Sequence, residues 1–269
     1  MTYHWVDTNR AEPFTADASD HRELMAQIWY PADPAAGAAR APYIAEAEGR
    51  CPVLVFLSGL YGFRSVSTFQ LEKLVSHGYA VVGLDQPGVV TTVRLPGPDP
   101  HRILAGHLDL GRVGVFGVSL GGRIAAESCL RDARIKACLV MDDPVPAGVV
   151  AAGLRQPTMF LTRDAETMRL ERRSSGGWSE HDIATTLGTM RAAYAKLSGG
   201  GYYVEIPELF HVNFTDLPYW LPASARLGLT GPIGGRRGLT VINALLNQAS
   251  RAIPGTTVAV RHRAQVPAE

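Results

Sequence analysis

One serine of this 269-residue chain stands between glycines at a spacing that suits nucleophilic chemistry. Residues 113–122 read VGVFGVSLGG, so Gly117, Ser119 and Gly121 form a G-x-S-x-G pattern between an apolar run and a helical one. A serine on such a sharp strand-to-helix turn crowds the backbone, and flanking glycines relieve the crowding. The start of the next helix favours developing negative charge. The pattern predicts Ser119 as a nucleophile, with an ordinary glycine-rich turn as the alternative.

A nucleophilic serine needs a general base, and the base needs an orienting carboxylate. In folds that use this turn, the chain order is serine, acid, histidine. Only His181, His211 and His262 follow Ser119. His211 comes shortly after a strand pattern, in PELFHVNFTD, whereas His181 lies in a segment that could cover the site and His262 lies in the tail. We therefore expect His211 to be the base.

Three carboxylates could orient that base. Asp142 and Asp143 end the apolar run ACLVMD, and Asp164 ends the next run, TMFLTRD. Either strand end can reach an imidazole at the same edge of a sheet. Spacing alone leaves the three acids open.

The elements that must position these residues alternate between buried strands and helices. Continuous apolar runs bounded by glycine or proline are typical of strands buried on both faces, and a period of 3.6 is typical of helices. We expect strands at 22–31, 52–59, 79–85, 112–117, 136–142, 158–162 and 201–206, and helices at 67–78 (capped by Ser67), 123–130 and 238–251. This alternation predicts one α/β domain over 1–269, with a mostly parallel sheet and helices on both faces.

The segment 165–200 breaks this rhythm. It is polar at first, which favours a flexible connection, and then helical over about 179–196. Two interpretations stand: a cap or lid over the site, or a plain crossover helix with a loose loop. The tail after Pro254 has only weak strand signals.

Composition narrows the class of protein. The chain is 46% apolar and 19% charged with a net charge of +1, which fits a globular protein and predicts no nucleic-acid partner. No run approaches the ~20 apolar residues of a membrane span, and the polar start does not resemble a signal peptide, so we expect a cytoplasmic protein. Cys51, Cys129 and Cys138 lack metal-site spacing and predict free thiols, two of them buried.

Several segments resemble the platelet-activating-factor acetylhydrolase group of α/β-hydrolases. They run from ELMAQIWYP to about Arg251 and include VLVFLSGLYGFR, LVSHGYAVVGLD, GVSLGG, LFHVNFTD and GRRGLTVINALL, of which LFHVNFTD is the most specific. The chain departs from that group at Ser58, where the group often has histidine before the oxyanion glycine, and at Val118, where it often has histidine before the nucleophile.

The resemblance implies an α/β-hydrolase fold and chooses among the acids. In that group the acid follows the strand after the elbow helix, which is Asp142 here, with Asp143 its neighbour. Asp164 sits where most other α/β-hydrolases hold their acid. The resemblance also places one oxyanion N–H at Leu60, and the second is that of Leu120, directly after the nucleophile.

These assignments predict a serine hydrolase that cleaves small-molecule esters with short or medium acyl groups and needs no metal or cofactor. Candidate pocket walls are Leu60, Tyr61, Phe63, Leu120, Pro144, Trp178, Phe210 and Phe214. Arg64 is either an anion-binding group or a surface residue at a helix start. Two alternatives keep the fold: the same triad used for acyl transfer or cyclisation, and a ligand-binding protein without catalysis. The sequence leaves the oligomeric state open.

Overall fold

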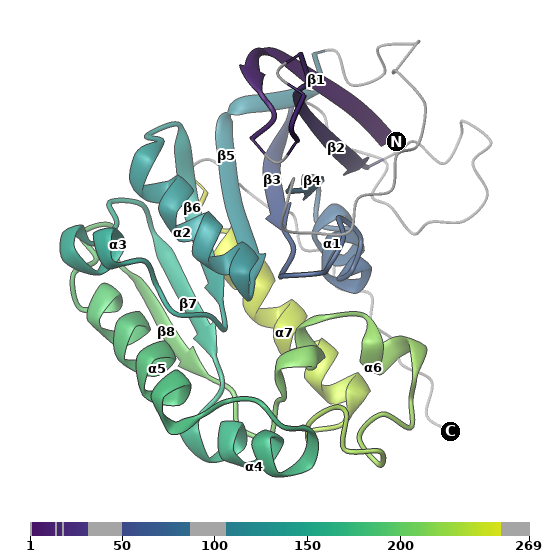
Figure 1. The fold of residues 1–269 in the computed structure, drawn as a ribbon, viewed down its shortest axis with the longest axis vertical. Coiled ribbons are helices and arrows are strands. Elements are labelled where there is room, and N and C mark those ends of the chain that lie inside the picture. The colour runs from purple at the N-terminus through teal and green to yellow at the C-terminus, as the bar shows by residue number, and fades with distance from the viewer. Residues whose placement is uncertain (1, 14, 18, 32–49, 87–105, 254–269) are drawn as a thin grey trace.

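The computed structural model describes residues 2–13, 15–17, 19–31, 50–86 and 106–253. These residues form an eight-stranded sheet in the order β1-β2-β4-β3-β5-β6-β7-β8 (Figure 1). Its strands are β1 Thr2–Ala11, β2 His21–Trp29, β3 Cys51–Leu57, β4 Ala80–Asp85, β5 Leu108–Val118, β6 Ile135–Met141, β7 Thr158–Thr162 and β8 Gly201–Glu205. β2 pairs antiparallel with both of its neighbours, and the strands from β4 to β8 run parallel. The parallel sheet predicted from the apolar runs is therefore confirmed.

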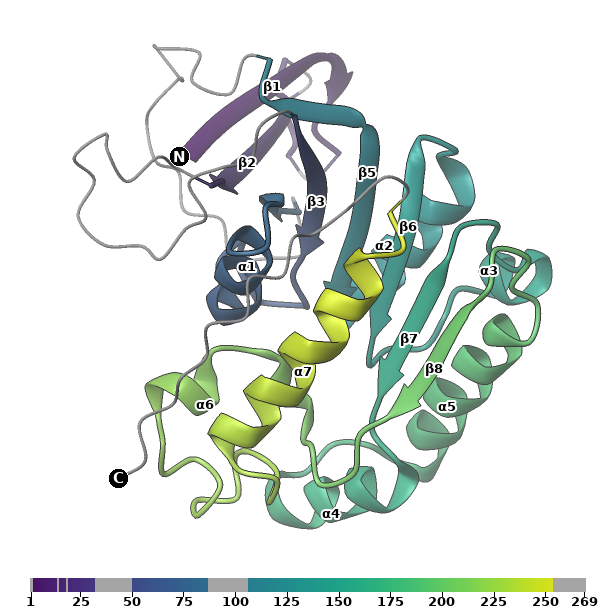
Figure 2. The same cartoon turned by 180° about the vertical axis from the view of Figure 1, so that it is seen from behind.

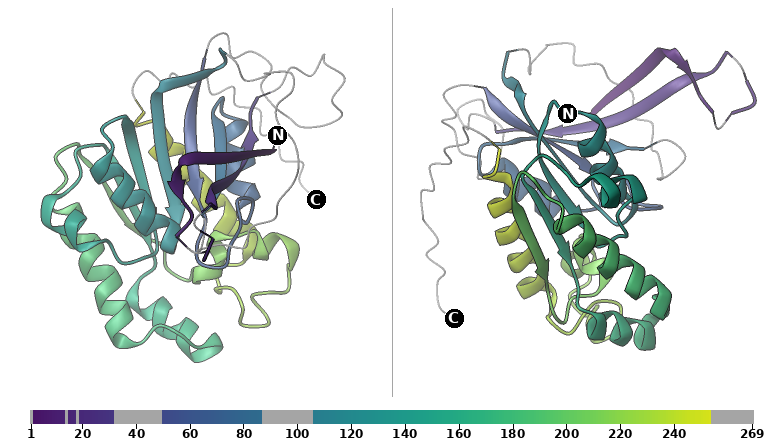
Figure 3. Two further views of the ribbon diagram at one scale, coloured as in Figure 1. Left: turned by 45° about the horizontal axis from the view of Figure 1, so that its top comes forward. Right: turned by 90° about the vertical axis from the view of Figure 1, so that its left-hand side faces the viewer.

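Helices cover both faces of this sheet. They are α1 Thr68–Val75, α2 Leu120–Arg131, α3 Ala147–Ala152, α4 Ala165–Ser175, α5 Glu180–Tyr194, α6 Leu217–Trp220 and α7 Gly235–Ser250, with a 3-10 helix at His211–Phe214. α1 and α7 pack on one face, where Leu71 and Ile242 share a core with Phe116. α2, α3 and α5 pack on the other, where Ala125 and Met190 share a core with other strand residues. Figure 2 shows the first face, and Figure 3 (right) shows yellow α7 on the opposite side of the sheet from the teal and green helices.

The structure corrects the expectation of a flexible connection after Asp164. Residues 165–175 form α4, whose start is capped by Asp164, and α5 begins at Glu180 behind a capping box made by Ser179 and Asp182. α5 packs against α3, β7 and β8, as a crossover helix between two parallel strands does. The strand β1 was not predicted, because its sequence TYHWVDTNRA is polar and largely exposed.

The start of α1 is held differently from the expectation. Ser67 makes no capping bond; its hydroxyl donates to the Phe214 carbonyl oxygen at 2.8 Å. The Asp216 carboxylate instead accepts the N–H groups of Thr68 and Phe69, at 2.9 and 3.0 Å. This cap from a distant residue ties the segment after His211 to the start of α1.

Two further expectations concern parts of the molecule away from the serine. Cys129 and Cys138 are buried free thiols, and Cys51 is a half-buried one, as predicted. No helix in the described ranges is both long and apolar enough to cross a bilayer. The tail 254–269 and His262 lie outside the described residues.

Candidate active site

Ser119 occupies the sharp turn that the glycine pattern predicts. β5 ends at Val118, α2 begins at Leu120, and Ser119 between them has φ 56° and ψ −134°. A Cβ on Gly117 would lie 2.4 Å from the Gly121 backbone, and one on Gly121 would lie 2.1 Å from a β3 carbonyl oxygen. Both distances are too short for any side chain, so the predicted need for glycine on each side of the serine is confirmed.

Backbone strain collects around this turn. Five described non-glycine residues have a left-handed φ, namely Tyr61, Ser119, Asp142, Trp178 and Glu208. The first four are all residues that the sequence assigned to the site. Each such conformation costs about 1–3 kcal/mol and persists only where surrounding contacts enforce it. Their clustering makes this edge of the sheet the candidate functional site.

His211 and Asp142 meet at the carboxyl ends of the strands. His211 begins the 3-10 helix after β8, and its Nδ1 lies 2.5 Å from Oδ2 of Asp142, the residue directly after β6. Oδ1 of the same carboxylate accepts the Thr162 hydroxyl at 2.9 Å, and Oδ2 also accepts Nε–H of Arg163 at 2.8 Å. Asp142 is fully buried, whereas His211 is partly exposed. The buried Asp142 carboxylate thus orients the imidazole, and another part of the ring is open to solvent.

The two other candidate acids have different partners. Asp143 pairs with Arg123 at 2.8 Å. Asp164 accepts the Thr167 N–H at 2.9 Å as the cap of α4. Neither carboxylate makes a hydrogen bond with His211 among the described residues, so the geometry favours Asp142 as the carboxylate that orients His211.

Ser119 lies on the neighbouring strand end. Its N–H donates to the carbonyl oxygen of Met141 at 2.8 Å, and Met141 is the residue immediately before Asp142. Gly59 packs so closely that a Cβ there would lie 2.9 Å from the Ser119 Cβ. No hydrogen bond joins Ser119 Oγ to His211 in the described part of the chain. Such nucleophile–base bonds are often long before substrate binds.

The two expected oxyanion donors flank the serine. Within the described ranges, the N–H groups of Leu60 and Leu120 donate to no protein acceptor, which leaves both available to a ligand. The loop that carries Leu60 is held by Asp85, whose carboxylate accepts the Arg64 N–H at 2.7 Å and pairs with the Arg64 guanidinium. Arg64 is only 5% exposed. The expectation that it is a surface residue at a helix start was therefore wrong.

The expected pocket residues divide by exposure. Tyr61 is 80% and Phe63 44% exposed, and Leu60 is also exposed, so this loop presents an apolar rim. Phe210 and Phe214 are buried, and Phe214 belongs to the main core. Leu120 and Pro144 are half-buried beside Ser119 and Asp143.

Trp178 comes to the site from the turn between α4 and α5. Its ring lies 4.3 Å from the Arg163 guanidinium and 5.2 Å from the His211 ring, which it meets edge-on at 62°. The segment 165–200 therefore reaches this edge of the sheet through Trp178 and through Glu171 of α4, while α5 packs on the sheet.

Arg163 and Glu171 are the residues that sequence reasoning missed. Arg163 is fully buried and Glu171 is 5% exposed, although such side chains are normally at the surface. Burial raises the pKa of Asp142, but the Arg163 guanidinium and the hydrogen bond from His211 outweigh it and lower that pKa to about 2. The available signal was an Arg-Asp pair directly after the buried run TMFLT, at the same edge as the serine.

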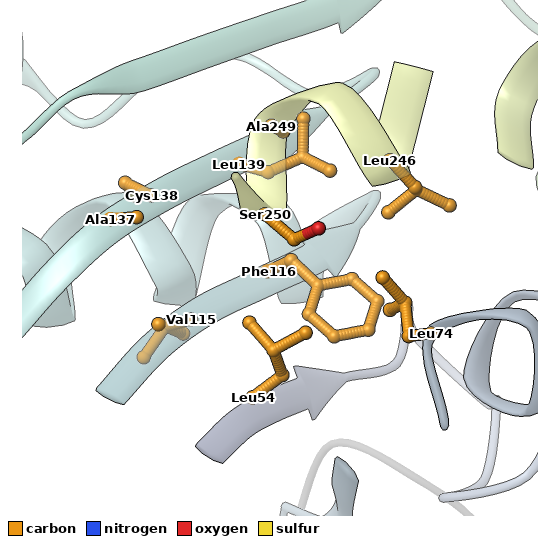
Figure 4. Close-up of a pocket in the computed structure, with 11 residues that line it drawn as sticks. Leu54, Leu74, Val115, Phe116, Ala137, Cys138, Leu139, Leu246, Ala249 and Ser250 are labelled. Atoms are coloured by element: carbon orange, nitrogen blue, oxygen red, sulfur yellow. The ribbon is translucent and has the colours of Figure 1, made fainter. Parts of the chain in front are cut away.

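An apolar pocket elsewhere is unconnected with these groups. It lies between α7 and the sheet and is lined by side chains such as Leu54, Phe116, Leu246 and Ser250 (Figure 4). Its strand residues lie within β3, β5 and β6, before the strand ends that carry Ser119 and Asp142. Among the described residues no group of His, Cys, Asp or Glu is arranged as a metal site.

Comparison with solved structures agrees with this topology. A ferulic acid esterase from Streptomyces cinnamoneus superposes with a TM-score of 0.68 at 24% identity, over 98% of this chain and 92% of its own. A cold-adapted esterase from an Arctic intertidal metagenomic library superposes with a TM-score of 0.51 at 15% identity, over 92% of this chain and 93% of its own. This chain has the α/β-hydrolase fold. No family model and no curated protein sequence matches it, so the comparisons establish the fold alone.

Proposed function

We propose that this α/β-hydrolase cleaves carboxylic esters, with Ser119 as nucleophile, His211 as general base and Asp142 as the acid. The observation that carries the proposal is the 2.5 Å contact between His211 Nδ1 and the buried Asp142, next to a strained serine on the adjoining strand end. The strain supports a nucleophile because a serine has no packing reason to adopt this conformation.

The mechanism follows from the positions of these groups. His211 Nε2 takes the proton of Ser119 as the hydroxyl oxygen attacks the ester carbonyl. Asp142 holds Nδ1 protonated and stabilises the imidazolium that forms. The same proton then passes from His211 to the leaving alkoxide as the acyl-enzyme forms. Water, deprotonated by His211, attacks the acyl carbonyl, and the tetrahedral intermediate collapses to the free acid as Ser119 Oγ leaves and takes the proton back from His211.

The N–H groups of Leu60 and Leu120 are the proposed donors to the tetrahedral oxyanion. Their availability supports this role, and removal of one such donor costs other enzymes about 10²–10³-fold in kcat. The exposed rim of Tyr61 and Phe63 suits a small ester with an apolar group. We propose short or medium acyl chains, and the resemblance to platelet-activating-factor acetylhydrolases supports the position of the acid.

The test is hydrolysis of p-nitrophenyl esters from acetyl to octanoyl by the wild type, Ser119→Ala and Ser128→Ala. Ser128 lies on the same helix, half-buried, and is the matched control. We expect turnover by the wild type and Ser128→Ala, and a loss of at least about 10⁴-fold in Ser119→Ala. An inactive wild type would contradict the proposal. If the wild type releases one burst of p-nitrophenol and then turns over only after an alcohol or amine is added, the enzyme catalyses acyl transfer in place of hydrolysis.

A further inference from the structure

Four groups form a closed ring of contacts around His211. Asp142 Oδ2 contacts His211 Nδ1 at 2.5 Å and accepts Nε–H of Arg163 at 2.8 Å. The other side of the Arg163 guanidinium pairs with the Glu171 carboxylate. Glu171 in turn accepts the backbone N–H of His211, at 3.2 and 3.3 Å to its two oxygens. The imidazole is held by one carboxylate, its main chain by another, and Arg163 joins the two.

This ring is buried in a way that stability does not explain. The side chains of Asp142 and Arg163 have no exposed surface, that of Glu171 has 7%, and the Trp178 ring covers the guanidinium. Desolvating such ions costs several kcal/mol each, and apolar residues of similar volume often stabilise a core better. A buried charged cluster beside a reacting histidine is a candidate for tuning its chemistry.

The charges of the ring balance only when the imidazole is protonated. Two carboxylates and one guanidinium leave one net negative charge beside neutral His211, which the imidazolium then neutralises. Without Glu171, Arg163 alone would offset the charge of Asp142, and little negative potential would remain to stabilise the imidazolium.

One further charged pair lies near His211. Asp143, after β6, is partly buried and paired with Arg123 of α2, which is half-exposed. Burial raises the pKa of Asp143, while Arg123 opposes that change. The turn between α4 and α5 contributes the uncharged Trp178. Because Asp143 already has its own cation, the ring through Arg163 and Glu171 is the stronger influence on His211.

We propose that Arg163 and Glu171 are positioning residues for the base: Arg163 fixes the Asp142 carboxylate, and Glu171 fixes the His211 main chain and offsets the Arg163 charge. The inference rests on the proposed function, since it assigns these two residues to the same pair of His211 and Asp142. Arg163 orients the carboxylate and Glu171 balances the charge, so substitutions of each residue test the two roles separately.

The pH dependence of kcat/KM tests the charge balance. Glu171→Gln keeps an oxygen for the His211 N–H but removes the negative charge, so we expect the acidic limb to move to lower pH by about one unit. Glu166→Gln removes a carboxylate from the exposed side of the same helix and is the matched control, with no shift expected. An acidic limb in Glu171→Gln that coincides with the wild type would overturn the inference.

Substitutions of Arg163 test orientation. Arg163→Lys keeps the charge and loses the Nε–H that Asp142 accepts, so we expect about a tenfold loss of kcat with the acidic limb almost unmoved. Arg163→Gln removes the charge, and we expect its acidic limb at higher pH than that of the wild type. If Arg163→Gln does not fold, Arg163→Lys and Glu171→Gln carry the test. Wild-type kcat in Arg163→Lys would contradict the orienting role.

A proton NMR readout separates this inference from the proposed function. The Nδ1 proton between His211 and Asp142 should give a far-downfield resonance that Asp142→Asn abolishes. We expect Glu171→Gln to move it upfield, because Arg163 then draws more of the Asp142 charge, and Glu166→Gln to leave it unchanged. If these shifts occur in a protein that hydrolyses no ester, the proposed function fails and the ring stands. If esters are hydrolysed but Glu171→Gln leaves the resonance unmoved, the inference alone fails.

Discussion

Two buried arginine–aspartate pairs flank the serine, and they differ in what the aspartate touches. On one side, Asp85 ends β4 and binds both the guanidinium and the N–H of Arg64, a residue of the loop that carries the expected oxyanion donor. On the other, Asp142 follows β6, and its Oδ2 contacts both Arg163 and His211. The same two residue types hold a backbone in one place and contact the histidine that we propose as the base in the other.

Because the two pairs contact different groups, their loss should change different measured properties. Loss of Asp85 frees a loop, so its effects belong to folding stability and to the oxyanion. Loss of Asp142, Arg163 or Glu171 changes the electrostatic field at His211, so it should change kcat and the pH dependence of kcat.

The largest expected effect is that of Asp142→Asn. It removes the charge that orients His211, and we expect kcat at neutral pH to fall by about 10⁴-fold. The matched variant is Asp164→Asn, since Asp164 only caps α4, and its kcat should stay within about threefold of the wild type. Steady-state kinetics decides, and the reverse order of the two losses would overturn the assignment of the acid.

Asp85→Asn comes next and should act on the fold. It removes the carboxylate charge that pairs with the buried Arg64 guanidinium, and we expect the free energy of unfolding to fall by about 3 kcal/mol. The acidic limb of kcat/KM should not move. Urea unfolding and a pH profile measure both quantities; a shifted limb at wild-type stability would erase the distinction between the two pairs.

The depressed pKa of Asp142 predicts how stability depends on pH. Because its folded pKa of about 2 lies below the unfolded value of about 3.9, the ionised group stabilises the fold above pH ~4 and loses this contribution as pH falls toward 2. The contribution is about 2 kcal/mol. Chemical unfolding between pH 5 and about 2.5 should show a steeper loss for the wild type than for Asp142→Asn, and parallel curves would count against it.

Trp178→Ala should have the smallest of these effects. Removal of the ring admits water to Arg163 and frees one side of His211, so we expect kcat/KM to fall by about tenfold. Trp5→Ala, on the exposed face of β1, is the control and should change kcat/KM by less than about twofold. Equal effects of the two substitutions would remove Trp178 from the site.

The sequence was sufficient for the elements whose pattern is local. The serine turn follows from two glycines, and the parallel strands follow from apolar runs such as that of β7, in which every residue is buried. The proposal of Asp142 as the acid needed the help of a family resemblance, because Asp142 and Asp164 both follow buried runs.

What the sequence hid depends on contacts between distant residues. α4 was missed because its buried face carries Thr167, Met168 and Glu171, so no apolar stripe marks it as a helix that packs. Arg163 is buried only because the carboxylates of Asp142 and Glu171 meet it from other elements. The same holds for Asp216, which caps α1 from nearly 150 residues away.

Covalent labelling tests the central claim most directly. The protein would be treated with a p-nitrophenyl dialkyl phosphate and analysed by intact mass and peptide mapping, beside Ser119→Ala and His211→Ala. The account predicts one phosphoryl group per chain on Ser119, none in Ser119→Ala and much slower labelling in His211→Ala. A label on another residue, or an unlabelled wild type that still hydrolyses esters, would contradict it.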